Sequence, residues 1–192
     1  EFILPGKEGT VITLKHGEVL DQEGNVYFEN LRKADQLVRY TFKGEERESF
    51  EPHFTFMGFR YVMIDDYPHD INLENITGKV IHSDMPFVGN FECSDDLINR
   101  LQKNIQWGLR GNFLDVPTDC PQRDERMGWT GDAQVFALTA CFNVNAAAFY
   151  TKWMKDLALE QREDGSVPWV VPNVLDDGGG TGWSDGFGAT GW

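Results

Sequence analysis

The chain has 192 residues, 41% hydrophobic and 25% charged, as expected of a globular protein with one large domain or two small ones. Its formal net charge of −14 repels phosphate groups, which argues against nucleic acid and anionic membranes as partners, and no apolar run is long enough to span a bilayer. Three cysteines without a CxxC pair indicate reduced, mostly buried thiols, which favours a cytoplasmic protein.

Residues 1–88 are predicted to form an antiparallel β-sandwich domain. Residues 11–16 alternate between the two faces of a strand, and Gly, Asp and Asn turns separate the β-forming runs. The expected strands cover residues 11–16, 26–28, 37–42, 51–56, 59–64 and 78–82. Short strands at this spacing are typical of a sandwich.

Residues 89–192 are predicted to form a second, helical domain. Leucine or isoleucine recurs every fourth position from Leu97 to Leu109, which indicates an amphipathic helix, and Ser94 is the expected N-cap. A short helix follows over residues 133–142, and a longer one, capped by Asn145, extends to about residue 162.

The loop between these helices carries the residues suited to chemistry. It contains two arginines, Trp129 and five carboxylates, namely Asp115, Asp119, Asp124, Glu125 and Asp132. Crowded carboxylates raise one another's pKa, which suits a group that must donate a proton. A tryptophan among carboxylates and arginines is a familiar arrangement for holding a sugar.

Loops of this composition also occur without any catalytic role. An acidic loop with arginines is often solvated surface or a set of structural ion pairs, and clustered oxygens can bind calcium, although the spacing of an EF-hand is absent. The four histidines show no metal-ligand spacing. We therefore expect neither a metal nor a cofactor.

Residues 110–134 read RGNFLDVPTDCPQRDERMGWTGDAQ, which closely resembles the signature of the bacterial α-L-rhamnosidases. The resemblance extends upstream to residues 18–21, 27–32 and 51–61, which are similar to the β-sandwich before the family's catalytic domain. It covers nearly the whole chain and weakens after Asp185, where residues 186–192 depart from the family pattern.

This resemblance implies a β-sandwich followed by the start of a catalytic toroid of six α-hairpins. The implied reaction is the hydrolysis of terminal α-L-rhamnosyl groups from a rhamnose-containing glycoside, with inversion at the anomeric carbon. Glu125 would be the general acid. The implied substrate-binding residues are Asp119, Arg123, Trp129, Asp132 and Trp183.

Some of these residues have competing interpretations. Glu125 could form a surface ion pair with Arg123 or Arg126, and Asp124 lies next to it in the sequence. Asp132 also suits the positive end of the following helix dipole.

The family's general base, a glutamate, lies far downstream, and the chain begins at Glu1 without a signal-peptide pattern. We therefore expect a truncated chain that lacks the rest of the catalytic domain and hydrolyses little or nothing alone. Two other functions remain open: a non-catalytic carbohydrate-binding or interaction fragment, and another inverting glycosidase on the same α/α toroid.

Overall fold

The computed structural model describes residues 1–175, which form two compact units. One unit contains Glu1–Val80 together with Gln122–Asp124, and the other contains Ile81–Pro121 and the chain from Glu125 onward. The domain boundary near residue 88 stays a prediction.

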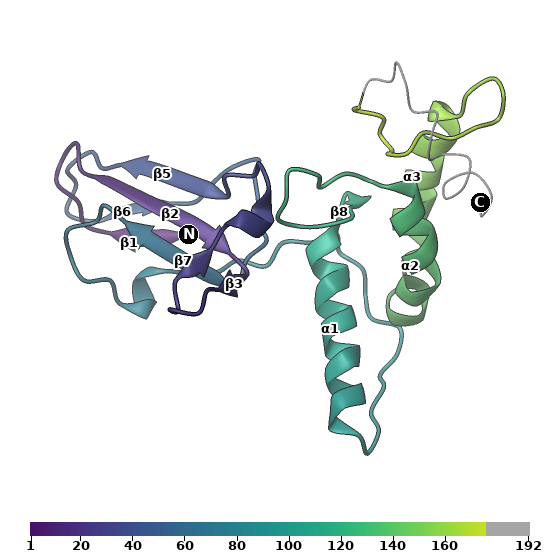
Figure 1. Ribbon diagram of the computed structural model, residues 1–192, viewed down its shortest axis with the longest axis horizontal. Helices are drawn as coiled ribbons and strands as arrows, with labels where there is room; N and C mark the ends of the chain where they lie inside the picture. Colours follow the sequence, from purple (N-terminus) through teal and green to yellow (C-terminus); the bar gives the residue numbers. More distant parts are fainter. Residues whose placement is uncertain (176–192) are drawn as a thin grey trace. The chain divides into compact units, whose positions relative to one another are not determined.

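The first unit is built from short antiparallel strands (Figure 1). These are β1 (Phe2–Leu4), β2 (Val11–Gly17), β3 (Val19–Leu20), β4 (Val26–Tyr27), β5 (Leu37–Thr41), β6 (Glu48–Phe50) and β7 (Tyr61–Asp65). They pair in the orders β5-β2-β7, β1-β6 and β3-β4. One-turn 3₁₀ helices lie at Glu29–Leu31 and Leu73–Asn75.

A single core joins the β1-β6 and β5-β2-β7 sheets. Phe2 and Leu4 from β1 pack with Ile12 and Leu14 from β2, and with Phe42 just after β5. Because two sheets share one apolar interior, the predicted β-sandwich is confirmed.

Two predicted strands are wrong. Residues 51–56 form no strand, because Pro52 lacks a backbone N–H and Phe54 has a positive φ of 58°. Residues 78–82 also form no strand, although their side chains favour one, because no neighbouring strand pairs with them in the described structure.

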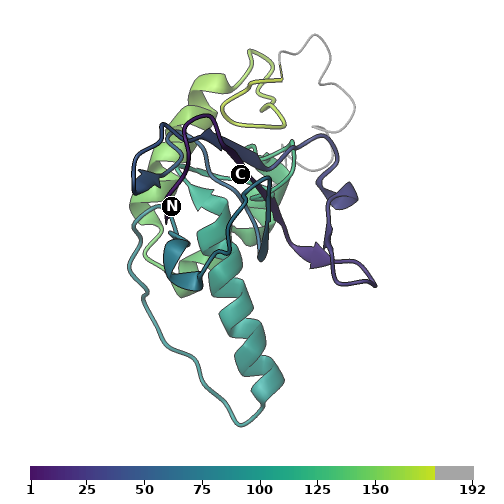
Figure 2. The ribbon, with the colours of Figure 1, turned by 90° about the vertical axis from the view of Figure 1, so that its left-hand side faces the viewer.

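The second unit contains three helices: α1 (Asp96–Asn112), α2 (Thr130–Asn143) and α3 (Ala147–Glu160). Between α1 and α2 lies a tight hairpin of β8 (Phe113–Leu114) and β9 (Val116–Pro117), whose turn residue Asp115 has a φ of 67°. Figures 1 and 2 show the segment before α1 running along this helix, and Phe87 in that segment bridges to Val144.

The helices are confirmed, but their ends differ from the predictions. Asp95, not Ser94, is the N-cap of α1, because its Oδ1 accepts from the N–H groups of Leu97 and Ile98 at 2.8 and 3.3 Å. The N-cap of α3 is Ala146 rather than Asn145.

The α2 helix begins three residues before the predicted start, because the backbone N–H of Thr130 donates to the Trp169 carbonyl at 2.8 Å. The start of α2 therefore depends on a hydrogen bond to Trp169, a residue far along the chain, and the local sequence does not predict it.

The helical unit has two apolar clusters. One contains Leu109, Phe113, Ala140 and Phe149, with the rings of Phe113 and Phe149 stacked at 4.7 Å between centroids. The other surrounds Trp153, which is fully buried on α3. These clusters hold the C-terminal end of α1 and the start of α2, the two elements on either side of the acidic loop.

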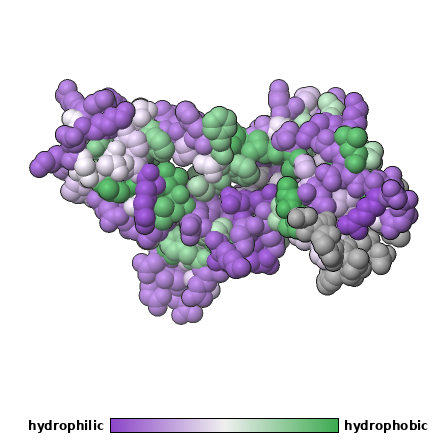
Figure 3. Space-filling model, turned by 90° about the horizontal axis from the view of Figure 1, so that it is seen from above, coloured by the Kyte–Doolittle hydropathy of each residue, from purple (hydrophilic) through white to green (hydrophobic). Residues whose placement is uncertain are grey.

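None of the helices within residues 1–175 combines the length and the apolar character that a bilayer crossing requires. The face drawn in Figure 3 is dominated by hydrophilic residues, with smaller apolar patches.

The thiols differ from the prediction. The three cysteines form no disulfide among the described residues; Cys120 is buried, Cys93 is half-buried and Cys141 on α2 is exposed. The expectation of mostly buried thiols is therefore wrong, because Cys141 lies on the outer side of α2.

Candidate active site

The acidic loop is closed at its base by two hydrogen bonds. The Asp119 N–H donates to the Met127 carbonyl at 3.2 Å, and the Met127 N–H donates to Asp119 Oδ1 at 3.1 Å. Arg126, just before Met127, has a φ of 52°, which turns the chain back towards Asp119. The side chain of Asp119 is thereby fixed by the loop that carries Glu125.

A strap formed by residues 167–171 holds the end of this loop against α2. Trp129 bridges to Val170, and the Val171 N–H donates to the Gly128 carbonyl at 2.8 Å. The Thr130 hydroxyl lies 3.1 Å from the Trp169 carbonyl oxygen. These contacts fix where Trp129 emerges from the backbone.

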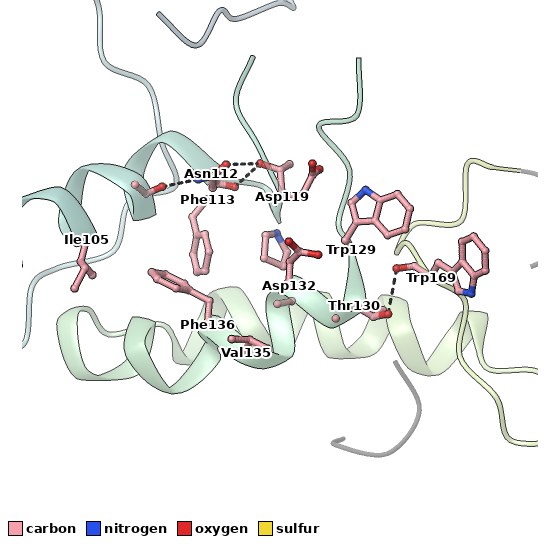
Figure 4. A pocket seen from close by; sticks show the side chains of 15 residues that line it. Ile105, Asn112, Phe113, Asp119, Trp129, Thr130, Asp132, Val135, Phe136 and Trp169 are labelled. Carbon is pink, nitrogen blue, oxygen red and sulfur yellow. Dashed lines mark hydrogen bonds between the residues drawn. The ribbon is translucent and has the colours of Figure 1, made fainter. Parts of the chain in front are cut away.

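A pocket of about 840 Å³ lies within the helical unit, between the end of α1, the β8-β9 hairpin and the start of α2. Figure 4 shows Asp119 and Asp132 near the middle of its lining, with Trp129 and Trp169 on one side and Phe113 and Phe136 on the other. Two aromatic walls with a few polar groups between them are typical of a small-molecule site.

The two tryptophans form a continuous apolar wall. Their rings are stacked, with 6.3 Å between centroids and 25° between planes. The indole Nε1 atoms of both are buried without a hydrogen-bond partner among the described residues. The wall thus offers flat apolar ring faces, while its indole N–H groups are buried.

Asp119, Cys120 and Glu125 gather at one end of the loop. One ligand atom from each lies within 4.8 Å of the other two, and the Cys120 Sγ is 3.9 Å from Glu125 Oε2. Glu125 is half-buried. The Glu125 carboxyl therefore lies beside Asp119, which itself lines the pocket.

Burial raises the pKa of Asp119. The neighbouring Glu125 carboxyl raises it further, and hydrogen bonds from Cys120 and the Met127 backbone act in the opposite direction. The Asp119 and Glu125 carboxyls therefore favour sharing one proton over carrying two adjacent negative charges.

The same three side chains are the group, among the described residues, whose donors could hold a metal ion. A thiolate and two carboxylates are ligand types that Zn²⁺ accepts, but the group contains no histidine, the ligand common in catalytic zinc sites. Proton transfer by a carboxyl group needs no metal.

The structure brings four of the six predicted site residues into the helical unit. Asp119, Trp129 and Asp132 line the pocket, with Asp132 exposed in the first turn of α2, and Glu125 lies beside Asp119. Arg123 belongs to the segment Gln122–Asp124, which packs with the β-rich unit. Trp183 lies outside the described residues.

Sequence reasoning missed three aromatic residues of the lining: Trp169, Phe113 and Phe136. Trp169 is separated from Trp129 by two helices, and no motif spacing connects the two positions. Phe113 and Phe136 also pack in the apolar cluster of the helical unit, and no sequence signal separates such pocket residues from ordinary core residues.

Comparison with known proteins identifies the class. Residues 1–82 match the bacterial alpha-L-rhamnosidase concanavalin-like domain, and residues 86–192 match the bacterial alpha-L-rhamnosidase 6 hairpin glycosidase domain. The architecture is therefore that of a glycoside hydrolase. The chain belongs to the bacterial α-L-rhamnosidase family.

Individual relatives support the same family assignment. The alpha-L-rhamnosidase of Streptomyces avermitilis is 48% identical over 181 residues, 94% of this chain and 18% of that protein. A Formosa agariphila alpha-L-rhamnosidase is 42% identical over 185 residues, 95% of this chain and 20% of that protein. The chain thus spans about a fifth of the length of these curated relatives.

Solved structures show the same fold. The Streptomyces avermitilis enzyme complexed with L-rhamnose superposes with a TM-score of 0.87 at 47% identity, covering 90% of this chain and 17% of that one. The native enzyme from Aspergillus terreus gives a TM-score of 0.87 at 43% identity, and the superposition covers 92% of this chain and 21% of that one.

Proposed function

We propose that this chain forms the proton-donating side of a site that hydrolyses terminal α-L-rhamnosyl groups with inversion. The observation that carries the proposal is the position of the Glu125 carboxyl beside Asp119, at the edge of a pocket that Trp129 and Asp132 also line. The structure of the Streptomyces avermitilis relative holds L-rhamnose, which supports this sugar as the ligand.

In the proposed reaction, Glu125 gives its proton to the glycosidic oxygen as the bond from that oxygen to the anomeric carbon breaks. A water molecule attacks the same carbon from the opposite face, and a second carboxylate accepts its proton. Asp119 and Asp132 bind rhamnose hydroxyls, and Trp129 contacts the ring.

The geometry supports different roles for Asp119 and Glu125. An inverting pair requires carboxyl groups roughly 6.5–9.5 Å apart so that water fits between the sugar and the base. Asp119 and Glu125 lie within 4.8 Å, too close for this arrangement. Asp119 is therefore assigned to binding, and the second catalytic carboxylate, the base, is neither Asp119 nor Glu125.

The aromatic wall supports sugar binding. A stacked pair of indoles matches the apolar C–H face of a pyranose.

The test substitutes Glu125→Gln in the complete protein that contains this chain. Hydrolysis of an aryl α-L-rhamnoside should fall by about 10²–10⁴-fold, because the general acid is lost. Rhamnose binding, measured by calorimetry, should persist.

Asp124→Asn is the matched control, because it removes the adjacent, exposed carboxyl and should leave turnover unchanged. Unaltered hydrolysis by Glu125→Gln together with loss in Asp124→Asn would move the acid to position 124. Rhamnose binding without turnover in the wild-type protein would instead support a carbohydrate-binding module. A panel of aryl glycosides separates α-L-rhamnosidase from another toroid glycosidase.

A further inference from the structure

The strap that holds the acidic loop against α2 is fastened through its backbone. The Trp169 carbonyl accepts from the Thr130 N–H at 2.8 Å. Two residues later, the Val171 N–H donates to the Gly128 carbonyl, also at 2.8 Å. Since neither hydrogen bond uses the Trp169 side chain, another side chain at position 169 leaves both in place.

The Trp169 indole lies against the pocket instead of in the core. Its neighbours Pro168 and Val170 are buried, whereas Trp169 itself is half-buried and lines the pocket. Its ring stacks on that of Trp129, with 6.3 Å between centroids. A tryptophan offers a large, rigid contact area and loses little conformational entropy on binding. The side chain is therefore suited to contact a ligand.

Phe113, on the other side of the pocket, is already used in packing. It is 3% exposed, and its ring stacks on that of Phe149 at 4.7 Å between centroids and 9° between planes. The ring of Phe136 meets it edge-on at 5.9 Å. Phe113 thus has little ring surface left for a ligand, unlike the half-buried tryptophans of the opposite wall.

Trp129 lies between the carboxylates of the pocket and Trp169 (Figure 4). A rhamnosyl group whose hydroxyls are bound by Asp119 and Asp132 therefore lies against Trp129, and Trp169 lies further from it. The pocket volume of about 840 Å³ is in the upper part of the roughly 300–1,000 Å³ typical of small-molecule sites, which leaves room for more than one sugar. A terminal rhamnosyl group is joined to the rest of its substrate through a single glycosidic oxygen. The part of the substrate that reaches Trp169 is then the leaving group.

We propose that Trp169 forms a subsite for the leaving group and favours substrates in which a flat ring is attached directly to the glycosidic oxygen. The ring is aromatic or is a second pyranose, since both present a flat face to an indole. This inference rests on the proposed rhamnoside hydrolysis and adds the class of leaving group. Trp169 determines specificity in this scheme and takes no part in proton transfer.

The test replaces Trp169 in the complete protein that contains this chain. Trp169→Leu removes the flat ring but keeps an apolar side chain. KM should rise about tenfold for 4-nitrophenyl α-L-rhamnoside, for a rhamnosyl-glucose disaccharide, or for both, because the ring contact of the leaving group is lost. The Kd of free L-rhamnose, measured by calorimetry, should stay nearly constant, because this sugar carries no leaving group.

Two variants serve as controls. Trp169→Phe keeps a flat ring and should restore most of the affinity lost in Trp169→Leu. Trp107→Leu makes the same change at a tryptophan that is 55% exposed on α1 and is not among the described residues that line the pocket. It should leave KM for both substrates unchanged. If Trp169→Leu fails to fold, Trp169→Met takes its place, because methionine adapts to irregular spaces.

Several outcomes would overturn the subsite. Equal losses of affinity for L-rhamnose and for the ring substrates would mean that Trp169 only supports Trp129. Constant KM values for both ring substrates would exclude any contact with the leaving group. A rise for the aryl rhamnoside alone identifies an aromatic leaving group, and a rise for the disaccharide alone identifies a sugar.

The Glu125→Gln variant is measured in parallel. If it loses most turnover while Trp169→Leu changes neither KM, the subsite inference fails and the proposed function stands. If Glu125→Gln retains full turnover while Trp169→Leu raises KM, the assignment of the general acid fails and the subsite remains.

Discussion

Asp119 is held from two directions, by the Met127 backbone and by the neighbouring Glu125 carboxyl. Burial is the largest cause of its raised pKa, and the second carboxyl adds to it. A raised carboxyl pKa means that the folded protein binds the proton more tightly than the unfolded chain. The associated stability is complete below the ordinary value of 3.8 and is lost as pH rises through the raised pKa.

Asp119→Asn should therefore change how stability depends on pH. The amide imitates the protonated acid and can still accept from the Met127 N–H, but it cannot acquire charge. The variant's Tm relative to wild type should be higher at pH 7 than at pH 4. Thermal unfolding at both pH values measures this, with Asp124→Asn as the control for an exposed carboxyl in the same loop. A Tm difference between variant and wild type that is the same at both pH values would contradict the prediction.

At the scale of elements, the strap of residues 167–171 determines where α2 begins and how Trp129 is presented. Gly128 makes the close approach possible. A Cβ at this position would lie 2.2 Å from the Val171 carbonyl oxygen and 3.1 Å from Trp153 Nε1. Trp153 Nε1 also donates to that same carbonyl at 3.0 Å, so neither neighbour can move freely.

Gly128→Ala should accordingly destabilise the helical unit by about 1–3 kcal/mol, the usual cost of forcing atoms into a packed site. Urea unfolding measures the loss. Gly108→Ala is the matched control, because a Cβ there meets nothing within 4 Å and the residue lies inside α1. It should be neutral or stabilising by about 0.5–1 kcal/mol. Equal effects of the two substitutions would show that the strap tolerates movement.

At the scale of the whole molecule, the proposed inverting mechanism needs a base at a distance that the Asp119–Glu125 pair does not provide. The chain matches about a fifth of its curated relatives. Exposed apolar side chains also follow one stripe of α2, where Val135, Leu138 and Phe142 are 78%, 67% and 73% exposed.

We expect residues 1–192 alone to give little or no hydrolysis of an aryl α-L-rhamnoside. The Streptomyces avermitilis alpha-L-rhamnosidase at equal molar concentration is the positive control. Turnover close to that of the control would mean that residues 1–192 supply both catalytic carboxylates, and would contradict this expectation.

The sequence predicted the parts of this architecture that depend on local pattern. Alternation along β2 and the four-residue spacing of α1 were sufficient to identify a β-rich unit followed by helices. The 25-residue motif placed Asp119, Trp129 and Asp132 together, and all three line the pocket.

What the sequence could not predict depends on contacts between distant positions. Trp169 reaches the pocket only because the strap pairs with Trp129. The attachment of Gln122 to Gln36 joins residues 86 positions apart, and neither carries a recognisable motif. Residues 78–82 failed as a strand for a related reason, since β-forming side chains need a neighbouring edge as well as propensity.

The excursion of residues 122–124 means that the backbone passes from one unit to the other three times, after Val80, after Pro121 and after Asp124. A chimaera that joins this β-rich unit to a relative's helices at a single junction near residue 80 would leave the tripeptide facing a foreign surface. Successful exchange would require the tripeptide to be transplanted together with Glu18 and Gln36, because these two side chains hold Gln122 within the β-rich unit.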